Sequence, residues 1–309
     1  MTRKRALVLT LALAAAVFVG LAFYADFGLL DQLGEFRWEL FPLALALTAL
    51  NYLLRFVRWH LYLGRLGIDV PMGRSFAVFV AGLTMTVTPA KTGEVLKCGL
   101  LRRSFDVPVR RSAPVVLAER VTDATGVVVL AVLAGASTDR WPLLVIALLG
   151  VAAIVLIVRS PLLERFAVLG EAPVAARLLL GPSLLAGMTA LSAVSWFFEC
   201  LAAYVCVRGL SLDLSLGDTV IVFTIGSLAG ALSFLPGGLG VAEASMTGLI
   251  RALGDVSKAS AAAATVLIRL TTLWFAVAIG LVGLAVEERL ARRASVSPET
   301  ARRYSNTVN

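Results

Sequence analysis

Apolar runs of about 20 residues recur along the whole chain, and they restrict its fold more than any other feature. Hydrophobic residues make up 59% of the 309 positions and the mean hydropathy is +0.89, more than the core of a soluble domain can bury. Hydrocarbon offers no partner to backbone N–H and C=O groups, so spans of this length must be α-helices. The runs are also too long and continuous for the strands of a transmembrane barrel. The sequence therefore predicts an all-α integral membrane protein with several spans.

Basic residues lie at the ends of these runs. The formal net charge is +8, but Lys and Arg form no patch interleaved with aromatic residues, which argues against nucleic-acid binding. Arg3-Lys4-Arg5 precedes the first run, which we interpret as an uncleaved span with its N-terminus inside. We expect a multi-pass protein of a prokaryotic cytoplasmic membrane, with both termini in the cytoplasm. Arg55 and Arg58 are assigned to the cytoplasmic edge of the second span, with Trp59 at the membrane interface.

Two short segments break the apolar pattern with proline, glycine and charge, residues 88–97 and 235–243. The apolar run before Pro89 is too short to cross a hydrocarbon core of about 30 Å, and basic residues flank both sides of the break. We therefore predict a re-entrant helical hairpin over about 75–103 that enters from the cytoplasm. A second hairpin is predicted over about 216–253, entering from outside.

Each half of the chain then holds two spans, one hairpin and a further span. The six predicted spans cover residues 6–24, 40–57, 112–136, 141–158, 184–207 and 259–286. Three crossings per half require the second half to start from the opposite face, so 1–140 and 141–288 are predicted to form an inverted-topology repeat. A basic cytoplasmic tail follows over 289–309. Paired interrupted segments in such halves indicate a transporter binding site near the bilayer midplane.

Nine ionisable side chains fall at membrane depth in this topology, where each costs at least about 2.5 kcal/mol at a helix centre. They are Lys91, Glu94, Lys97, Glu119, Arg120, Asp123, Glu199, Glu243 and Arg269. Lysine is a compact donor suited to phosphate, and Lys91 and Lys97 flank the first break.

Several roles stay open for these charges. Glu94 and Glu243 either satisfy the N–H groups at the start of the returning half-helices or bind a ligand directly. The group at 119–123 is either a water-accessible site or a salt-bridge cluster that locks helices. Arg269 needs a partner from elsewhere, Glu243 or Glu199, and Glu199 is alternatively a proton or sodium carrier.

Other residue types argue against metal or disulfide chemistry. Cys98, Cys200 and Cys206 lie in apolar segments without CxxC spacing, and His60 is the single histidine. We expect no metal and no cofactor. Gly226 and Gly230 form a GxxxG pair, which favours close helix packing.

Four motifs, in order, resemble the flippase-like transmembrane region of lysylphosphatidylglycerol synthases and their stand-alone relatives. They are Pro89-x-Lys91-x-Gly93-Glu94-x-x-Lys97, Glu119-Arg120-x-x-Asp123, Pro236-Gly237-Gly238-x-Gly240-x-x-Glu243, and Arg269 with Trp274. The likeness covers nearly the whole chain and implies a protein that moves a lipid or lipid-linked head group between leaflets. The chain ends at residue 309 without an aminoacyl-transferring domain, so it is not expected to make the lysyl lipid.

The predicted function is a flippase for a membrane phospholipid or a polyprenyl-phosphate-linked lipid, and not an enzyme. The alternatives are an ion-coupled small-solute secondary transporter and an intramembrane enzyme acting on polyprenyl lipids. Assembly into a homo-oligomer is left open. The predicted substrate-binding residues are Lys91, Gly93, Glu94, Lys97, Glu119, Arg120, Asp123, Glu199, Pro236, Gly237, Gly238, Gly240, Glu243 and Arg269.

Overall fold

The structure is a computed structural model, which describes residues 28–87, 94–137 and 172–295 together with positions 19, 20, 23 and 25. Every regular element among them is helical, as the sequence predicts. The predicted spans 6–24 and 141–158 fall almost wholly or wholly outside the described residues, as do Pro89, Lys91 and Gly93.

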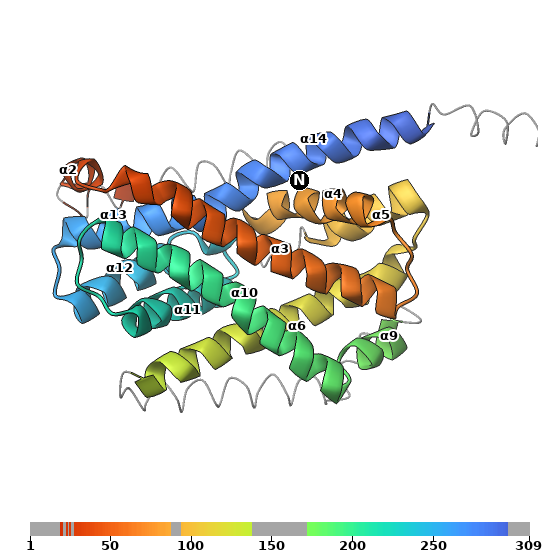
Figure 1. Ribbon diagram of the computed structural model, residues 1–309, viewed down its shortest axis with the longest axis horizontal. Helices are drawn as coiled ribbons and strands as arrows, with labels where there is room; N and C mark the ends of the chain where they lie inside the picture. Colours follow the sequence, from red (N-terminus) through yellow and green to blue (C-terminus); the bar gives the residue numbers. More distant parts are fainter. Residues whose placement is uncertain are drawn as a thin grey trace, which may run out of the picture.

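Three helical stretches in the described part are long and apolar enough to cross a membrane: Trp38–Arg65, Pro182–Gly209 and Lys258–Ala291. The first is α3 (Phe41–Arg65) with its preceding turn η1 (Trp38–Leu40), and the second is α10 (Pro182–Gly209). Both helices carry proline in their first turn, where its missing N–H removes no helical hydrogen bond. They pack side by side through the centre of the molecule (Figure 1).

The third stretch is a long helix with a π-helical turn inside it. It consists of α13 (Lys258–Arg269), the π turn η6 (Leu270–Trp274) and α14 (Phe275–Ser295). The sequence predicts one uninterrupted span over 259–286. The prediction misses the π turn because an i→i+5 turn changes hydrogen bonding without changing the apolar pattern.

Shorter helices occupy the segments around the two breaks. The first break has α4 (Met72–Leu83), the turn η2 (Thr84–Val87) and α5 (Val95–Phe105). The second has α11 (Leu216–Leu232), the turn η5 (Pro236–Gly238) and α12 (Val241–Gly254). Helix α6 (Val109–Ser137) lies between them, and α2 (Leu29–Gly34) and α9 (Ala172–Leu179) are peripheral. Figure 1 shows α4 and α5 at one end of the long axis and α11 and α12 at the other.

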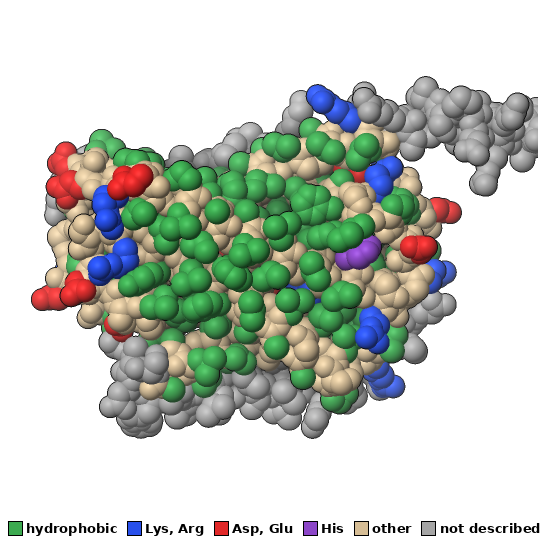
Figure 2. Space-filling view, viewed as in Figure 1, with side chains coloured by type: hydrophobic (Ala, Val, Ile, Leu, Met, Phe, Trp, Pro, Cys, Tyr) green, Lys and Arg blue, Asp and Glu red, His purple; other side chains and the backbone are tan. Residues whose placement is uncertain are grey.

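Hydrophobic side chains cover the middle of the face shown in Figure 2, and charged side chains lie mainly toward its two ends. Large apolar residues such as Leu43, Leu53 and Leu61 on α3 are exposed at the surface of the protein. A soluble protein rarely exposes so large an apolar surface, whereas a membrane-spanning bundle must do so.

Glycine lets several helices approach each other closely. A Cβ at Gly230 or Gly226 of α11 would overlap side chains of α12, which supports the packing role predicted for the GxxxG pair. Gly280 and Gly283 bring α14 against α4 and η2 in the same way. At the far end of this contact the buried Glu287 carboxylate accepts hydrogen bonds from Arg74 (3.1 Å) and Ser104 (2.7 Å).

Gly280→Ala is expected to lower the free energy of unfolding by about 1–3 kcal/mol, because the new Cβ would overlap the backbone of Leu83 and Thr84. Gly187→Ala on α10 is the matched control, since no atom lies within 4 Å of a Cβ there. Denaturant unfolding in mixed micelles measures both. Equal stability of the two variants would contradict the close approach of α14 to η2.

Candidate functional site

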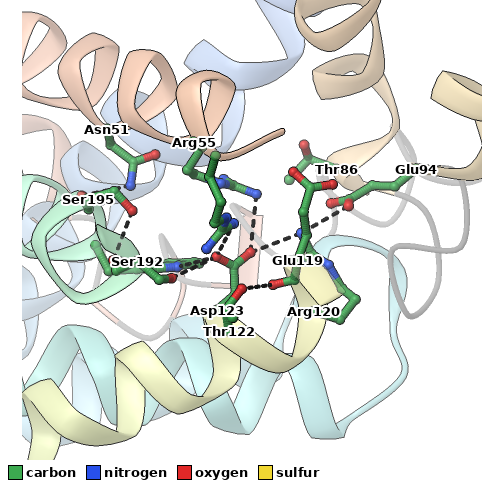
Figure 3. Close-up of polar contacts among 12 residues, drawn as sticks. Asn51, Arg55, Thr86, Glu94, Glu119, Arg120, Thr122, Asp123, Ser192 and Ser195 are labelled. Atoms are coloured by element: carbon green, nitrogen blue, oxygen red, sulfur yellow. Dashed lines mark hydrogen bonds and ion pairs between the residues drawn. The ribbon is translucent and has the colours of Figure 1, made fainter. Parts of the chain in front are cut away.

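The Asp123 carboxylate on α6 is the centre of a buried ion-pair network (Figure 3). It accepts a hydrogen bond from Arg58 at 2.6 Å and contacts Arg55 at 3.5 Å, both from α3. Arg120, one turn earlier on α6, lies 3.0 Å away. A single carboxylate therefore meets three guanidinium groups, so further anions are needed nearby to offset the remaining positive charge.

Helix α10 completes the surroundings of Asp123. Ser192 donates to its Oδ1 at 3.0 Å and the Trp196 indole N–H donates to the same oxygen at 3.1 Å. The guanidinium carbon of Arg55 lies 5.6 Å from the centroid of the Trp196 ring, within cation–π range. Asp123 thus connects α3, α6 and α10.

Two sequence-based predictions on α3 are wrong. The sequence predicts Arg55 and Arg58 at the cytoplasmic edge and Trp59 at the membrane interface, but all three side chains are buried inside the protein. The helix continues to Arg65 instead of ending near residue 57, which moves these side chains into the interior. Their charge is tolerated there because Asp123 is supplied by α6.

The residues around the first break form a second set of pairs beside Asp123. Glu94 contacts Arg120 at 2.9 Å, so this arginine lies between two carboxylates. Lys97 donates to Glu119 at 2.5 Å, and its ammonium lies 4.3 Å from the centroid of the Trp59 ring. Lys97 and Glu119 are nearly inaccessible, at 4% and 1% side-chain exposure, which favours a structural role for that pair.

The second break carries its own ion pair. Arg269 donates from Nε to Glu243 at 2.6 Å and from a terminal nitrogen to the Gly237 carbonyl at 2.7 Å. The other oxygen of Glu243 accepts from the Gly240 N–H at 2.7 Å, at the start of α12. Of the two partners considered for Arg269, Glu243 is thus the one in contact, and it also satisfies a free N–H at the half-helix N-terminus.

The π turn lies next to this pair. Arg269 is the last residue of α13 before η6, and the Tyr52 hydroxyl of α3 donates to the Thr272 carbonyl within the turn at 2.8 Å. A π turn leaves its backbone without the usual i→i+4 pairing, and such turns are frequent at functional sites. Tyr52 therefore stabilises the part of the helix that presents Arg269.

A cavity of about 310 Å³ joins the two sets of charges. Arg55, Arg120, Asp123, Glu199 and Arg269 supply its charged wall, and Gly237 and Gly238 of the second break line it as well. The remaining wall is largely apolar and includes Phe223, Leu228, Phe234 and Leu235 from α11 and the residues after it. Small-molecule sites commonly have volumes of about 300–1,000 Å³, so this cavity is large enough for a small ligand and lies at the lower end of that range.

Three arginines and two carboxylates line the cavity, and Glu94 and Glu243 behind this wall pair with two of the arginines. Arg120 is the most accessible of the ion-paired arginines described above, with 27% of its side chain exposed. A guanidinium binds phosphate or carboxylate through two parallel hydrogen bonds. The guanidinium groups on the wall could therefore bind an anionic group in competition with their carboxylate partners. No group of His, Cys, Asp and Glu side chains able to hold a metal ion occurs in the described part of the chain.

The structure brings most of the predicted site residues into two clusters joined by the cavity. Glu94, Lys97, Glu119, Arg120 and Asp123 form the first cluster, and Gly237, Gly240, Glu243 and Arg269 the second. Glu199 and Gly238 line the cavity between them. Pro236 opens the turn η5 without lining the cavity, and Lys91 and Gly93 lie outside the described residues.

Sequence reasoning missed five residues that complete the site: Tyr52, Arg55, Arg58, Ser192 and Trp196. A signal existed for Arg55, because the apolar and aromatic residues Trp59, Tyr62 and Leu63 continue the span beyond it. No comparable signal marks Ser192, which is an ordinary small residue in an apolar helix.

Long apolar helices around a charged cavity define a multi-pass helical membrane protein with an internal polar site. The model of the lysylphosphatidylglycerol synthase TM region matches residues 7–280, and the chain belongs to this family. Two matches to UPF0104 membrane proteins of Methanothermobacter thermautotrophicus are 35% identical over 92 residues and 32% identical over 105 residues. They cover 30% and 32% of this chain and 27% and 31% of the relatives, so the similarity extends over about a third of each protein.

Proposed function

We propose that this protein moves a phosphate-bearing lipid, or a lipid-linked head group, between the leaflets of the membrane. One observation carries the proposal: a cavity inside an apolar helical bundle, with Arg55, Arg120 and Arg269 on its wall. Charged residues at membrane depth are costly and mark substrate pathways. Membership of the lysylphosphatidylglycerol synthase TM region family agrees with a role in the membrane.

The transport mechanism that we propose uses the topology derived from the sequence. It has six spans and two opposed re-entrant hairpins, repeats over 1–140 and 141–288, and a basic tail over 289–309. Both termini lie in the cytoplasm of a prokaryote. The short helices α4 and α5 at one end of the molecule, and α11 and α12 at the other, support two opposed hairpins.

The turns η2 and η5, which would form the tips of the two hairpins, are in contact. Val87 of η2, Leu239 after η5 and Leu273 of the π turn form a small buried apolar cluster. In alternating access, one repeat moves against the other around a fixed site. Separation of this cluster would then expose the cavity to one side of the membrane while helix packing closes the other.

Within the cavity, we propose that Arg120 and Arg269 bind the lipid phosphate. Each already contacts a carboxylate, so an arriving phosphate would compete with that carboxylate for the guanidinium instead of meeting a bare charge. A displaced carboxylate loses its cation, and this cost weakens phosphate binding and favours release. Transport requires no bond making, so we assign no enzymatic role.

The test reconstitutes the purified protein in liposomes and follows a fluorescent phosphate-bearing lipid by chemical quenching of the outer leaflet. Arg120→Gln is expected to lower the rate about tenfold, the effect of losing roughly 1.4 kcal/mol of interaction with the phosphate. Arg103→Gln on the exposed end of α5 is the matched control and should transport normally.

Two other results would contradict different parts of the proposal. No protein-dependent lipid movement, together with uptake of a soluble solute that Glu199→Gln abolishes, would replace the proposal by an ion-coupled solute transporter. Equal rates for Arg120→Gln and Arg103→Gln would remove Arg120 from the binding site.

A further inference from the structure

Phe234 has an unusual backbone conformation at the rim of the cavity. It follows the last residues of α11 with φ of 56°, in the left-handed region. Helices commonly end with such a residue, but glycine normally occupies the position because a Cβ costs roughly 1 kcal/mol or more there. For a bulky aromatic residue this conformation is a genuine outlier.

The same break uses glycine wherever else it needs a left-handed residue. Gly237, Gly238 and Gly240 have φ of 62°, 67° and 88°. The other described non-glycine residues with positive φ are Asp106, Ser211 and Asp255, all small and polar. Phe234 is therefore the one bulky residue held in this conformation in the described part of the chain.

Packing inside the protein does not account for the phenylalanine. Its side chain is 69% exposed, and its neighbours Leu232 and Leu235 are 75% and 40% exposed. Phe234 and Leu235 also line the cavity, together with Leu228 of α11. The apolar surface of this segment is thus continuous with the cavity that holds Arg120 and Arg269.

We propose that Phe234, Leu232 and Leu235 form a tail subsite, which holds the first part of the hydrocarbon chain of the lipid whose phosphate occupies the cavity. The inference rests on the proposed function and specifies its substrate class as an amphiphile bound at both ends. The anionic group lies among the arginines, and the chain leaves the cavity sideways across the Phe234 ring. In this proposal the strained backbone at Phe234 has a function, because a glycine at this position would offer no apolar surface to the hydrocarbon chain of the lipid.

The position allows a discriminating variant. Phe234→Gly relieves the strained backbone while removing the ring, so folding stability should be retained or increased. Binding should nevertheless become weaker for a ligand with hydrocarbon chains. If Phe234 only stabilised the fold, the result would be the opposite: Phe234→Gly would lower the free energy of unfolding, and the folded variant would bind the ligand normally.

The experiment compares dihexanoyl phosphatidic acid with glycerol 3-phosphate, which share the phosphate and the glycerol and differ in the chains. Affinities are measured by calorimetry on the full-length protein in one detergent. We expect Phe234→Gly to bind the dihexanoyl lipid about tenfold more weakly and glycerol 3-phosphate unchanged. Leu133→Ala, which shortens a side chain 61% exposed on α6 and away from the cavity, should change neither affinity.

The outcomes separate the tail subsite from the proposed function. If the wild-type protein binds both ligands through Arg269 but Phe234→Gly weakens neither, the ring only faces bulk lipid and the subsite is refuted. Equal weakening of both ligands refutes it too, since Phe234 would then shape the head-group cavity. If the wild-type protein binds neither ligand, or binds them independently of Arg269, the proposed function itself fails.

Discussion

Asp123→Asn is expected to lower the free energy of unfolding by about 3–5 kcal/mol, the usual effect of removing one partner from a buried ion pair. The carboxylate faces Arg55, Arg58 and Arg120, and an amide would leave these guanidinium groups without their shared counter-ion. Ser192 and Trp196 also donate to it, so the loss extends to α10. Denaturant unfolding in mixed micelles measures the change.

The same substitution at the surface provides the control. Asp213 pairs with Arg208 at 3.6 Å, and its side chain is fully exposed. Solvent screens such a pair, so Asp213→Asn should leave stability unchanged. Similar losses in the two variants would mean that Asp123 is not the anion that holds α3, α6 and α10 together.

Features that depend on composition and periodicity could be predicted from the sequence. The helical class follows from the apolar runs, and α10 and α6 lie within a few residues of the predicted spans 184–207 and 112–136. The two interrupted segments could be recognised because proline and glycine act on the local backbone whatever the surroundings. That the chain crosses the membrane six times stays a prediction.

Features that depend on contacts between distant segments could not be predicted. A buried arginine and an arginine at the membrane edge look alike in a sequence, and only the carboxylate of α6, 65 positions from Arg58, makes the buried site tolerable. The π turn at 270–274 is likewise invisible in the apolar pattern. The pairing of Lys97 with Glu119 rather than with Glu94 is decided by how α5 packs on α6.

The ion pairs of the site differ in their access to the cavity. Lys97 and Glu119 are nearly inaccessible and suit a fixed support. Arg120 and Arg269 line the cavity, and each has a carboxylate partner that an entering anion can replace. Under the proposed function, the first pair would be a fixed support, and the other two pairs would open when a phosphate binds and close again when it leaves.

Arg269 lies in the second cluster, where stability and transport can be separated by a double variant. Arg269→Met alone leaves the buried Glu243 carboxylate without its cation and should cost about 3–5 kcal/mol. Adding Glu243→Gln removes the stranded charge, and the amide oxygen still accepts from the Gly240 N–H. Most of the lost stability should then return, because the double variant retains the hydrogen bond without a buried charge.

Lipid movement should not return with stability. If Arg269 binds the phosphate, the double variant folds but transports at least about tenfold more slowly than the wild-type protein in the liposome assay. Glu243→Gln alone keeps the guanidinium, so it should transport faster than the double variant although its arginine lacks a counter-ion. A stable double variant that moved lipid at the wild-type rate would show that the pair only fastens α13 to α12, and phosphate binding would then fall to Arg55 and Arg120 across the cavity.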